Sequence, residues 1–503
     1  MPREFDKKNL TDKEQKGLKS RFKLNLTFEE KIRQDFQRIA LELWPSLVEK
    51  SFFKQNGLDY WQSIFSYLGR SGMLDTRSIN RRTSRAKDLP KSDFYYVLNS
   101  RPIPDLSSAS KPNIKPLIMH AAGASLNSDE RISKAVGELV ERYVLLDSPE
   151  QKKLSASPEE LSKNGNSFVA LERFNQFQQF QKGRFKYLNR NSDSKLYWVS
   201  SENLLSKEIY LIPSQCVFWN YKFNREEPRI FPPTTNGAAG FFDEEKAILA
   251  GIYELIERDG FLIYWLNKLS PKVIDTSDYN NKEFQDFKKY MESFNFEITF
   301  LNTATDVGIP SCACIIVNRR TNKPSISMSA SAGLDAGKNL MTSLLGAYKN
   351  SFMWEYGKKK TILPPNYEPF LDPSIGMDFR RYLWHGEEMY QKFKFFISGE
   401  KINIRDIMIP KKWNSDAEEL NYVLSIFKEM GAGYEVYCYK AQDKILDDLG
   451  YKVVKMVIPE IFPLYLRENL ATLDSKRLCK VPEKLGLKPA TPNNYNPYPH
   501  PFP

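Results

Sequence analysis

Apolar residues recur at helical spacing along the stretch that follows the Thr-Asn-Gly turn at 235–237. The stretch reads FFDEEKAILAGIYELIERDGFLIYW, and its apolar side chains return every three or four positions between Ala247 and Leu262. This spacing predicts a long helix that begins after a short acidic loop. A second helix is predicted over 129–147, where the pentapeptide ELVER closely matches ELIER of the first helix.

Strands and helices alternate along most of the remaining chain. Amphipathic stretches predict helices at 283–293, 339–354 and 417–430, and apolar stretches between them predict strands. Such alternation predicts a mixed α/β fold rather than a helical bundle. The predicted strands read PLIMHAAG, FEITFLN, PSCACIIVN, YEVYCYK and YKVVKMVIPEIF.

The amino-terminal part differs in pattern from the rest. Residues 1–100 predict mainly helical structure, and 101–115 is rich in Pro and Ser and predicts a linker. We therefore expect an N-terminal segment with its linker over 1–115, and a main domain over 116–503 that ends in a Pro-rich tail at 490–503. The N-terminal segment shows no recognisable chemistry, and both a docking role and a plain structural role stay open.

Each of the two similar pentapeptides places two glutamates and an arginine on one helix face, because residues three and four apart point the same way. A single such cluster is typical of a solvent-exposed ion pair. Two copies flanked by apolar residues are different, because four carboxylates beside a core repel one another unless a cation lies between them. The residues of the two clusters are Glu138, Glu141 and Arg142, and Glu254, Glu257 and Arg258.

Mg²⁺ is the cation that best suits these carboxylates. It prefers oxygen ligands and commonly sits between carboxylates and nucleotide phosphates. The planar guanidinium groups of Arg142 and Arg258 suit phosphate oxygens. The sequence therefore predicts a Mg-nucleotide site built from two helices, with the four glutamates as metal ligands.

Composition narrows the class of protein. The chain has 503 residues, 41% of them hydrophobic, which is enough for a sizeable core. Its formal net charge is +11, but no basic run with interleaved aromatics indicates a nucleic-acid groove, so no nucleic-acid partner is expected. Five cysteines without a CxxC pair fit a reducing cytosol. No apolar run reaches the length of a membrane span, which predicts a cytoplasmic protein without a membrane partner.

The paired ExxER helices, the TNG turn and the chain end PYPHPFP together resemble the YcaO superfamily. More narrowly, they resemble the azoline-forming cyclodehydratases of thiazole- and oxazole-modified peptide biosynthesis. The resemblance runs from about Pro116 to Pro503 and implies a YcaO-type fold in which the two ExxER helices form a Mg-ATP site. It adds Asn236 and Glu245 to the residues that line this site.

Two stretches depart from the family pattern. The segment HAAGASLNS before the first ExxER helix lacks the Gly-Lys-Gly element that often stands there in the family. Gly346 stands where the family usually has a glutamate. These departures leave the start of the nucleotide pocket and one expected contact undecided.

The resemblance implies ATP-dependent modification of a ribosomal precursor peptide. A Cys, Ser or Thr side chain attacks the neighbouring backbone carbonyl, ATP phosphorylates the resulting oxygen, and loss of phosphate leaves a thiazoline or oxazoline ring. The alternate prolines of the tail favour a stiff, extended backbone. The resemblance implies that this tail enters the active site with the Pro503 carboxylate as base, and His500 is a weaker candidate. A frayed tail is the plain alternative.

The chain carries no Rossmann-type GxGxxG and no CxxC segment. The resemblance therefore implies a separate activating-enzyme-like partner that binds the leader of the precursor peptide. It further implies a flavin dehydrogenase in the same complex and a homodimer. Two other functions stay open, namely another YcaO chemistry such as thioamide formation, and a non-catalytic scaffold subunit of a peptide-modifying synthetase complex.

Overall fold

The contacts within the chain divide it into two units. The first comprises Met1–Ile79 and Leu98–His120, and the second comprises Asn80–Val97 and Ala121–Pro503. The computed structural model describes residues 68, 95–99 and 119–502, except 149–150, 190–193, 225, 320–323, 352–360 and 410. The helices predicted over 1–100 and the predicted boundary at residue 115 lie outside the described residues and stay predictions. The second unit contains the elements that position the site.

A five-stranded sheet forms one half of the second unit, and its strands follow the order β10-β9-β8-β7-β11. All neighbours are antiparallel except β11 and β7, which run parallel. Strand β9 lies between β10 and β8, and the register pairs its Asn318 with Ser325 on one side and Phe296 on the other. The strands are β7 (Lys272–Asp275), β8 (Phe296–Asn302), β9 (Ser311–Asn318), β10 (Ser325–Ala332) and β11 (Lys401–Asn403).

Strand β9 is buried on both faces, which explains why its sequence is a continuous apolar run. Side chains alternate across a strand, so Cys314 and Ile316 point to one face and Ile315 to the other. The first face packs against the helices α8 (Lys282–Glu292) and α9 (Ala336–Ser351). The second face packs against the carboxyl-terminal half of helix α7. Cys312 and Cys314 of this strand are both buried.

A six-stranded antiparallel sheet forms the other half of the unit. Five of its strands follow the order β3-β4-β12-β13-β6, and the sixth, β5, also pairs with β4. Helix α4 lies against β6. The elements are β3 (Leu154–Ala156), β4 (Leu196–Asn203), β5 (Ile209–Pro213), β6 (Ala238–Phe241), β12 (Tyr437–Lys440), β13 (Lys452–Val457) and α4 (Ser128–Val144).

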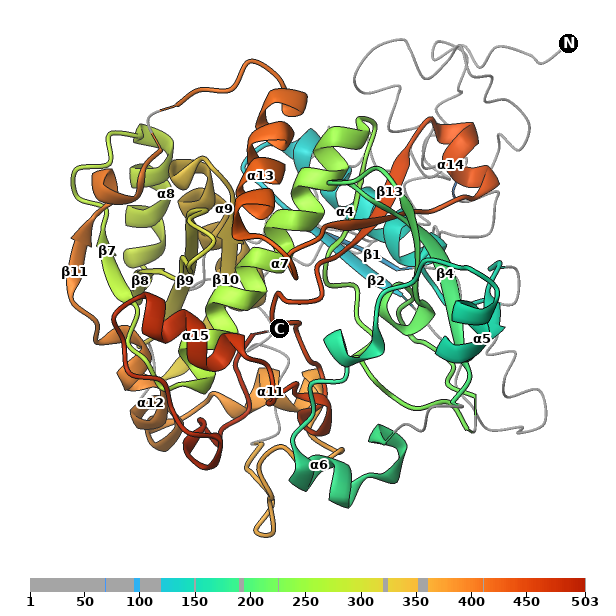
Figure 1. The fold of residues 1–503 in the computed structure, drawn as a ribbon. Coiled ribbons are helices and arrows are strands. Elements are labelled where there is room, and N and C mark those ends of the chain that lie inside the picture. Colours follow the sequence, from blue (N-terminus) through green and yellow to red (C-terminus); the bar gives the residue numbers. More distant parts are fainter. Residues whose placement is uncertain are drawn as a thin grey trace, which may run out of the picture. The chain divides into compact units, whose positions relative to one another are not determined.

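Helix α7 (Glu244–Leu266) connects the two sheets (Figure 1). It begins where the Asp243 side chain accepts a hydrogen bond of 2.9 Å from the Lys246 N–H, a typical N-cap. Its first half packs with α13 (Asp416–Met430) against β12 and β13, and its second half packs against the five-stranded sheet. The second ExxER motif therefore lies midway between two cores. The predicted mixed α/β fold with two long ExxER helices is confirmed.

The remaining described elements are short. Strand β1 (Tyr95–Asn99) pairs with β2 (His120–Ala124). Among the described residues, no helix combines the length and apolar composition that a membrane crossing requires. The other helices are α5 (Pro158–Lys163), α6 (Gln179–Arg184), α11 (Met377–Leu383), α12 (Glu387–Phe393), α14 (Lys444–Leu449) and α15 (Arg477–Lys484). Short 3-10 turns lie at Leu171–Arg173, Lys186–Leu188, Ser214–Cys216, Lys394–Ile397, Ile404–Ile407, Glu468–Leu470 and Pro492–Asn494.

Candidate active site

The first glutamate of each ExxER motif is held in the same way. Glu138 receives the Arg142 guanidinium on one carboxylate oxygen (2.5 Å) and the backbone N–H of Ala122 on the other (2.7 Å). Glu254 likewise receives Arg258 on one oxygen (2.9 Å) and the N–H of Gly237 on the other (2.8 Å). The sequence repeat is therefore also a structural repeat, in which a preceding segment supplies the backbone donor.

This arrangement explains what the segment HAAG does without a Gly-Lys-Gly element. Its backbone N–H at Ala122 fixes Glu138, as the TNG turn fixes Glu254. A side chain at Gly123 would place its Cβ 1.9 Å from the carbonyl oxygen of Arg131, so only glycine allows β2 to approach α4 this closely. The segment thus keeps a structural role in the site.

The second glutamates of the two motifs, Glu141 and Glu257, lie in surroundings that disfavour the charged carboxylate. Burial raises the pKa of Glu141 well above its ordinary value, and the nearby carboxylates of Glu254 and Glu138 raise it further. Burial also raises the pKa of Glu257 to about 7, although Arg258 opposes this shift from 2.6 Å. The Glu254 carboxylate is therefore near enough to Glu141 to act on its pKa, although the two residues lie on different helices. That the two motifs form one site stays a prediction.

The Asn236 side chain is buried directly before Gly237, whose backbone N–H donates to Glu254. It is 4% exposed, and neither its amide oxygen nor its amide nitrogen has a hydrogen-bond partner within the described residues. Leaving buried polar atoms unpaired is costly, so such an amide indicates that a ligand supplies the missing bonds. Together with carboxylates and arginines, the unpaired amide fits a bound Mg-nucleotide.

Among the residues that the structure describes, no three or more His, Cys, Asp or Glu side chains lie close enough together to hold a metal ion by themselves. Direct ligation by all four glutamates stays a prediction. Glu245 lies nine residues before Glu254 on α7, which is about 14 Å along the axis and on the opposite face. Its role in the site therefore also stays a prediction.

Gly346 does not point into the site. A Cβ at this position would lie 2.3 Å from the Ser329 hydroxyl of β10. Helix α9 approaches the sheet so closely here that the glutamate usual in the family would not fit. The departure at Gly346 is therefore explained by packing of this helix on the sheet.

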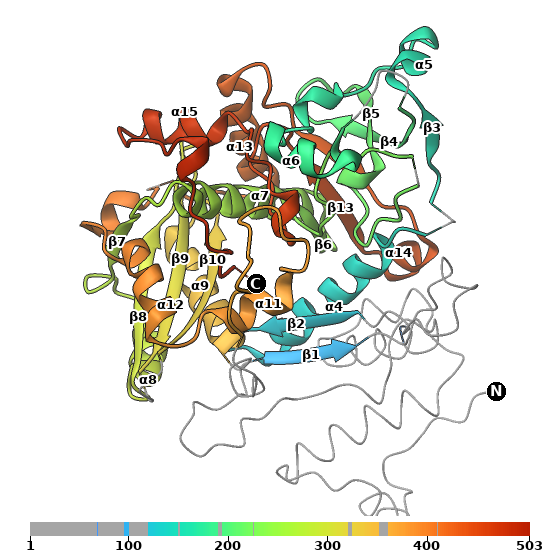
Figure 2. The ribbon, with the colours of Figure 1, turned by 90° about the horizontal axis from the view of Figure 1, so that it is seen from below.

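The Pro-rich tail is docked on the core, at least as far as Phe502, so the alternative of a frayed tail is wrong for these residues. Phe502 is 2% exposed, and its ring centre lies 4.1 Å from the Arg258 guanidinium carbon. In Figures 1 and 2 the carboxyl end lies beside α7 and α11. Pro503 lies outside the described residues, so the role of its carboxylate stays a prediction.

Aromatic side chains hold the tail by its carbonyl groups. The carbonyl of Pro497 accepts from the Tyr367 hydroxyl (2.9 Å), and the carbonyl of Tyr498 accepts from the Trp265 indole N–H (3.2 Å). The carbonyl of Pro499 accepts from the Trp384 indole N–H (3.2 Å). Proline has no N–H to donate, so a tail with alternate prolines must be held mainly through its carbonyls.

We expect Trp384→Phe to loosen this docking. The variant keeps an aromatic ring but leaves the Pro499 carbonyl without its donor, which costs about 1 kcal/mol for a neutral hydrogen bond. Limited proteolysis of the tail should therefore become faster by about fivefold. Trp413→Phe is the matched control, since its indole N–H has no partner among the described residues. Equal proteolysis rates for the two variants would contradict a docking role for Trp384.

His500, which belongs to the tail, is fully buried. Its Nε2 lies 3.0 Å from the Tyr465 carbonyl oxygen, to which it donates, and its ring contacts those of Tyr465 and Phe261. Burial and the Arg380 charge lower the pKa of His500 well below its ordinary value. A neutral, buried imidazole is a poor general base, so this geometry favours packing, and the catalytic role of His500 stays a prediction.

Sequence reasoning missed a buried ion pair next to the second motif. Asp259 accepts two hydrogen bonds from Arg477 of α15 (2.6 and 2.5 Å), and Arg477 also contacts Asp306 at 2.9 Å. Asp259 is fully buried and follows Arg258 directly. An aspartate amid apolar helix positions was the available signal, since such a charge needs a partner. The pair joins α15 to the ExxER helix.

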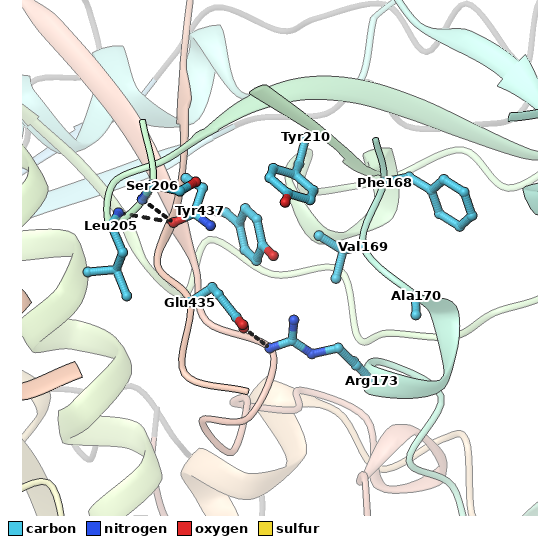
Figure 3. A pocket seen from close by; sticks show the side chains of 10 residues that line it. Phe168, Val169, Ala170, Arg173, Leu205, Ser206, Tyr210, Glu435 and Tyr437 are labelled. Carbon is cyan, nitrogen blue, oxygen red and sulfur yellow. Dashed lines mark hydrogen bonds and ion pairs between the residues drawn. The ribbon is translucent and has the colours of Figure 1, made fainter. Parts of the chain in front are cut away.

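A pocket of about 500 Å³ lies beside strands β4 and β12 of the six-stranded sheet (Figure 3). Tyr210 and Tyr437 line it together with Arg173, which contacts Glu435 at 2.8 Å. None of the predicted site residues lines this pocket. The pocket therefore does not bear on the chemistry of the ExxER site.

The family model described as YcaO cyclodehydratase, ATP- and Mg²⁺-binding, matches residues 123–461. The chain therefore belongs to the YcaO cyclodehydratase family. Its cofactors are ATP and Mg²⁺. A protein of Methanothermobacter thermautotrophicus, described only as uncharacterized, is 24% identical over 345 residues, which are 68% of this chain and 82% of that protein.

Three solved structures share the fold. A heterocyclase in complex with substrate and cofactor has a TM-score of 0.66 at 20% identity, over 84% of this chain and 54% of that one. The chain thus spans about half the length of that heterocyclase. YcaO from Methanopyrus kandleri, bound with AMPPCP and Mg²⁺, has a TM-score of 0.55 at 15% identity over 78% and 88%. The heterocyclase TruD has a TM-score of 0.57 at 18% identity over 96% and 71%.

Proposed function

We propose that this chain is an ATP-dependent cyclodehydratase subunit that converts Cys, Ser or Thr residues of a ribosomal precursor peptide into thiazoline or oxazoline rings. Family membership supports cyclodehydratase chemistry. The observation that carries the narrower proposal is the docked Pro-rich tail, whose Phe502 ring stacks on Arg258 of the ExxER helix. This contact links the carboxyl end of the chain to the nucleotide site.

The residues of the two motifs have distinct tasks in this proposal. Glu138 and Glu254, each fixed by a backbone N–H, would hold the metal side of Mg-ATP. Arg142 and Arg258 would turn from their own glutamates toward the phosphates, because their flat guanidinium groups match phosphate oxygens. Bound Mg-ATP supplies the phosphoryl group that makes the amide oxygen a good leaving group.

The tail has a separate task in this proposal. The attacking thiol or hydroxyl must lose its proton as it bonds to the amide carbon, so a base must stand beside it. The terminal carboxylate of Pro503 follows Phe502 directly in the chain and is the proposed base. Departure of phosphate and the amide proton then leaves the C=N bond of the ring, with one water lost overall.

Mass spectrometry tests the proposal directly. The chain is incubated with ATP, Mg²⁺, precursor peptide and the leader-binding partner, and the expected result is the loss of one water mass per ring. Glu254→Gln is the matched variant, and it should leave the precursor unmodified. ATP hydrolysis without loss of water, or oxygen replaced by sulfur when a sulfur donor is added, would favour thioamide formation. Absence of nucleotide binding would favour a scaffold subunit.

The partners follow from the same proposal. A leader-binding activating-enzyme-like protein and a flavin dehydrogenase would complete the complex, and the chain would form a homodimer. Residues 1–115 are proposed as the docking segment, and 116–503 as the catalytic domain. Size-exclusion chromatography of the chain alone and with the leader-binding partner would show whether either association forms.

A further inference from the structure

Lys455 is a buried lysine beside the 234–237 turn, and the sequence motifs did not reveal it. It lies on β13, opposite Ala238 of β6, and is 1% exposed. Its ammonium group donates to the carbonyl oxygen of Thr234 at 2.8 Å and to that of Asn236. Both carbonyls belong to the turn that precedes β6 and helix α7. Lys455 therefore anchors this turn from the sheet side.

The backbone of the turn is held from its other sides as well. The N–H of Gly237 donates to Glu254 (2.8 Å), and the carbonyl of Gly237 accepts from the N–H of Met456 (2.8 Å). The N–H of Asn236 donates to the Thr234 hydroxyl at 3.2 Å. The Asn236 side chain, in contrast, has no partner within the described part of the chain. The turn thus presents one buried amide while its backbone groups are already engaged.

Lys455 also interacts with both ExxER motifs. Burial lowers the pKa of Lys455 to about 8, and the carboxylates of Glu254 and Glu141 oppose this shift. Glu141 comes from α4 and Glu254 from α7, so one ammonium group lies near a glutamate of each motif. The Cys216 thiol is the other titratable group near it. Two carboxylates near a buried ammonium group offset part of the cost of burying its charge.

We propose that Lys455 is a positioning residue of the nucleotide site, which holds the 234–237 turn so that the Asn236 amide meets the bound nucleotide. This inference rests on the proposed nucleotide site. Its distinguishing consequence is that Lys455 and Asn236 act through the same contact.

The test compares the affinity for AMPPCP with Mg²⁺, measured by calorimetry without turnover, in four proteins. Asn236→Ala and Lys455→Met should each weaken binding by about tenfold, as expected for loss of one strong hydrogen bond. The affinity of the double variant should be no lower than that of the weaker-binding single variant, because the effects of two residues that act through one contact do not add. Lys455→Arg, which keeps the charge, should give an intermediate affinity.

Lys452→Met is the matched control, because Lys452 lies on the same strand but is exposed, and its affinity should equal that of the unmodified chain. Unchanged affinity in Lys455→Met, or strictly additive losses in the double variant, would overturn the inference. If Lys455→Met does not fold, Lys455→Arg decides, and affinity equal to the unmodified chain overturns it. An unmodified chain that binds no AMPPCP would instead overturn the nucleotide site itself.

Discussion

A chain extended by three residues beyond Pro503 is expected to lose ring formation by at least about 100-fold while its affinity for AMPPCP stays unchanged. The tail is docked on the core as far as its residue Phe502, whose ring lies against Arg258. Added residues would move the terminal charge away from the reacting amide, and a displacement of about 1 Å can cost on the order of 10²-fold in rate. The glutamates of α4 and α7 would keep their own backbone and arginine partners.

Two measurements decide this prediction, namely ring formation by mass and AMPPCP affinity by calorimetry. The matched control inserts the same three residues after Gly165, in an exposed loop where nothing lies within 4 Å of an added Cβ. Equal ring formation in the extended and control proteins would show that the tail end is dispensable. Loss of both ring formation and AMPPCP affinity in the extended protein would assign the tail a structural role.

Arg258→Lys is expected to lower kcat/KM for ATP by about 100-fold, although the charge is kept. The Arg258 guanidinium contacts Glu254 at 2.9 Å and Glu257 at 2.6 Å, and it stacks on Phe502. A single ammonium group cannot reproduce the fork or the stacking. A charge-assisted hydrogen bond is worth about 1.5–3 kcal/mol, so losing one accounts for a change of this size.

Arg142→Lys is expected to have a similar but smaller effect, because the Arg142 side chain is more exposed than that of Arg258. Arg184→Lys is the control, since Arg184 is exposed and its distance to Glu368 is 3.7 Å. Steady-state kinetics with varied ATP measures all three. Unchanged ATP kinetics in both motif variants would mean that these arginines only bridge the glutamates of their own helices.

Short-range pattern determined much of the fold from the sequence alone. Helical spacing of apolar residues predicted α7, α4 and α13, because each helix must bury one face and this requirement repeats every turn. The continuous apolar run of β9 likewise predicted a strand, and burial on both faces explains why the run is continuous. The duplicated ExxER pentapeptide predicted two clusters facing a common cation, because four carboxylates beside a core need one.

Tertiary structure decided the partners of these groups. The backbone donors at Ala122 and Gly237, the ammonium of Lys455 and the docking of the tail on Arg258 join segments that no local pattern relates. The sequence leaves the contact expected at Gly346 undecided, and the structure shows that this glycine allows close packing on β10. Periodicity reports which face of an element is buried, whereas the partner across that face depends on how separate elements pack. Local pattern therefore predicted the long helices and several strands, whereas the contacts between distant residues depend on how these elements pack.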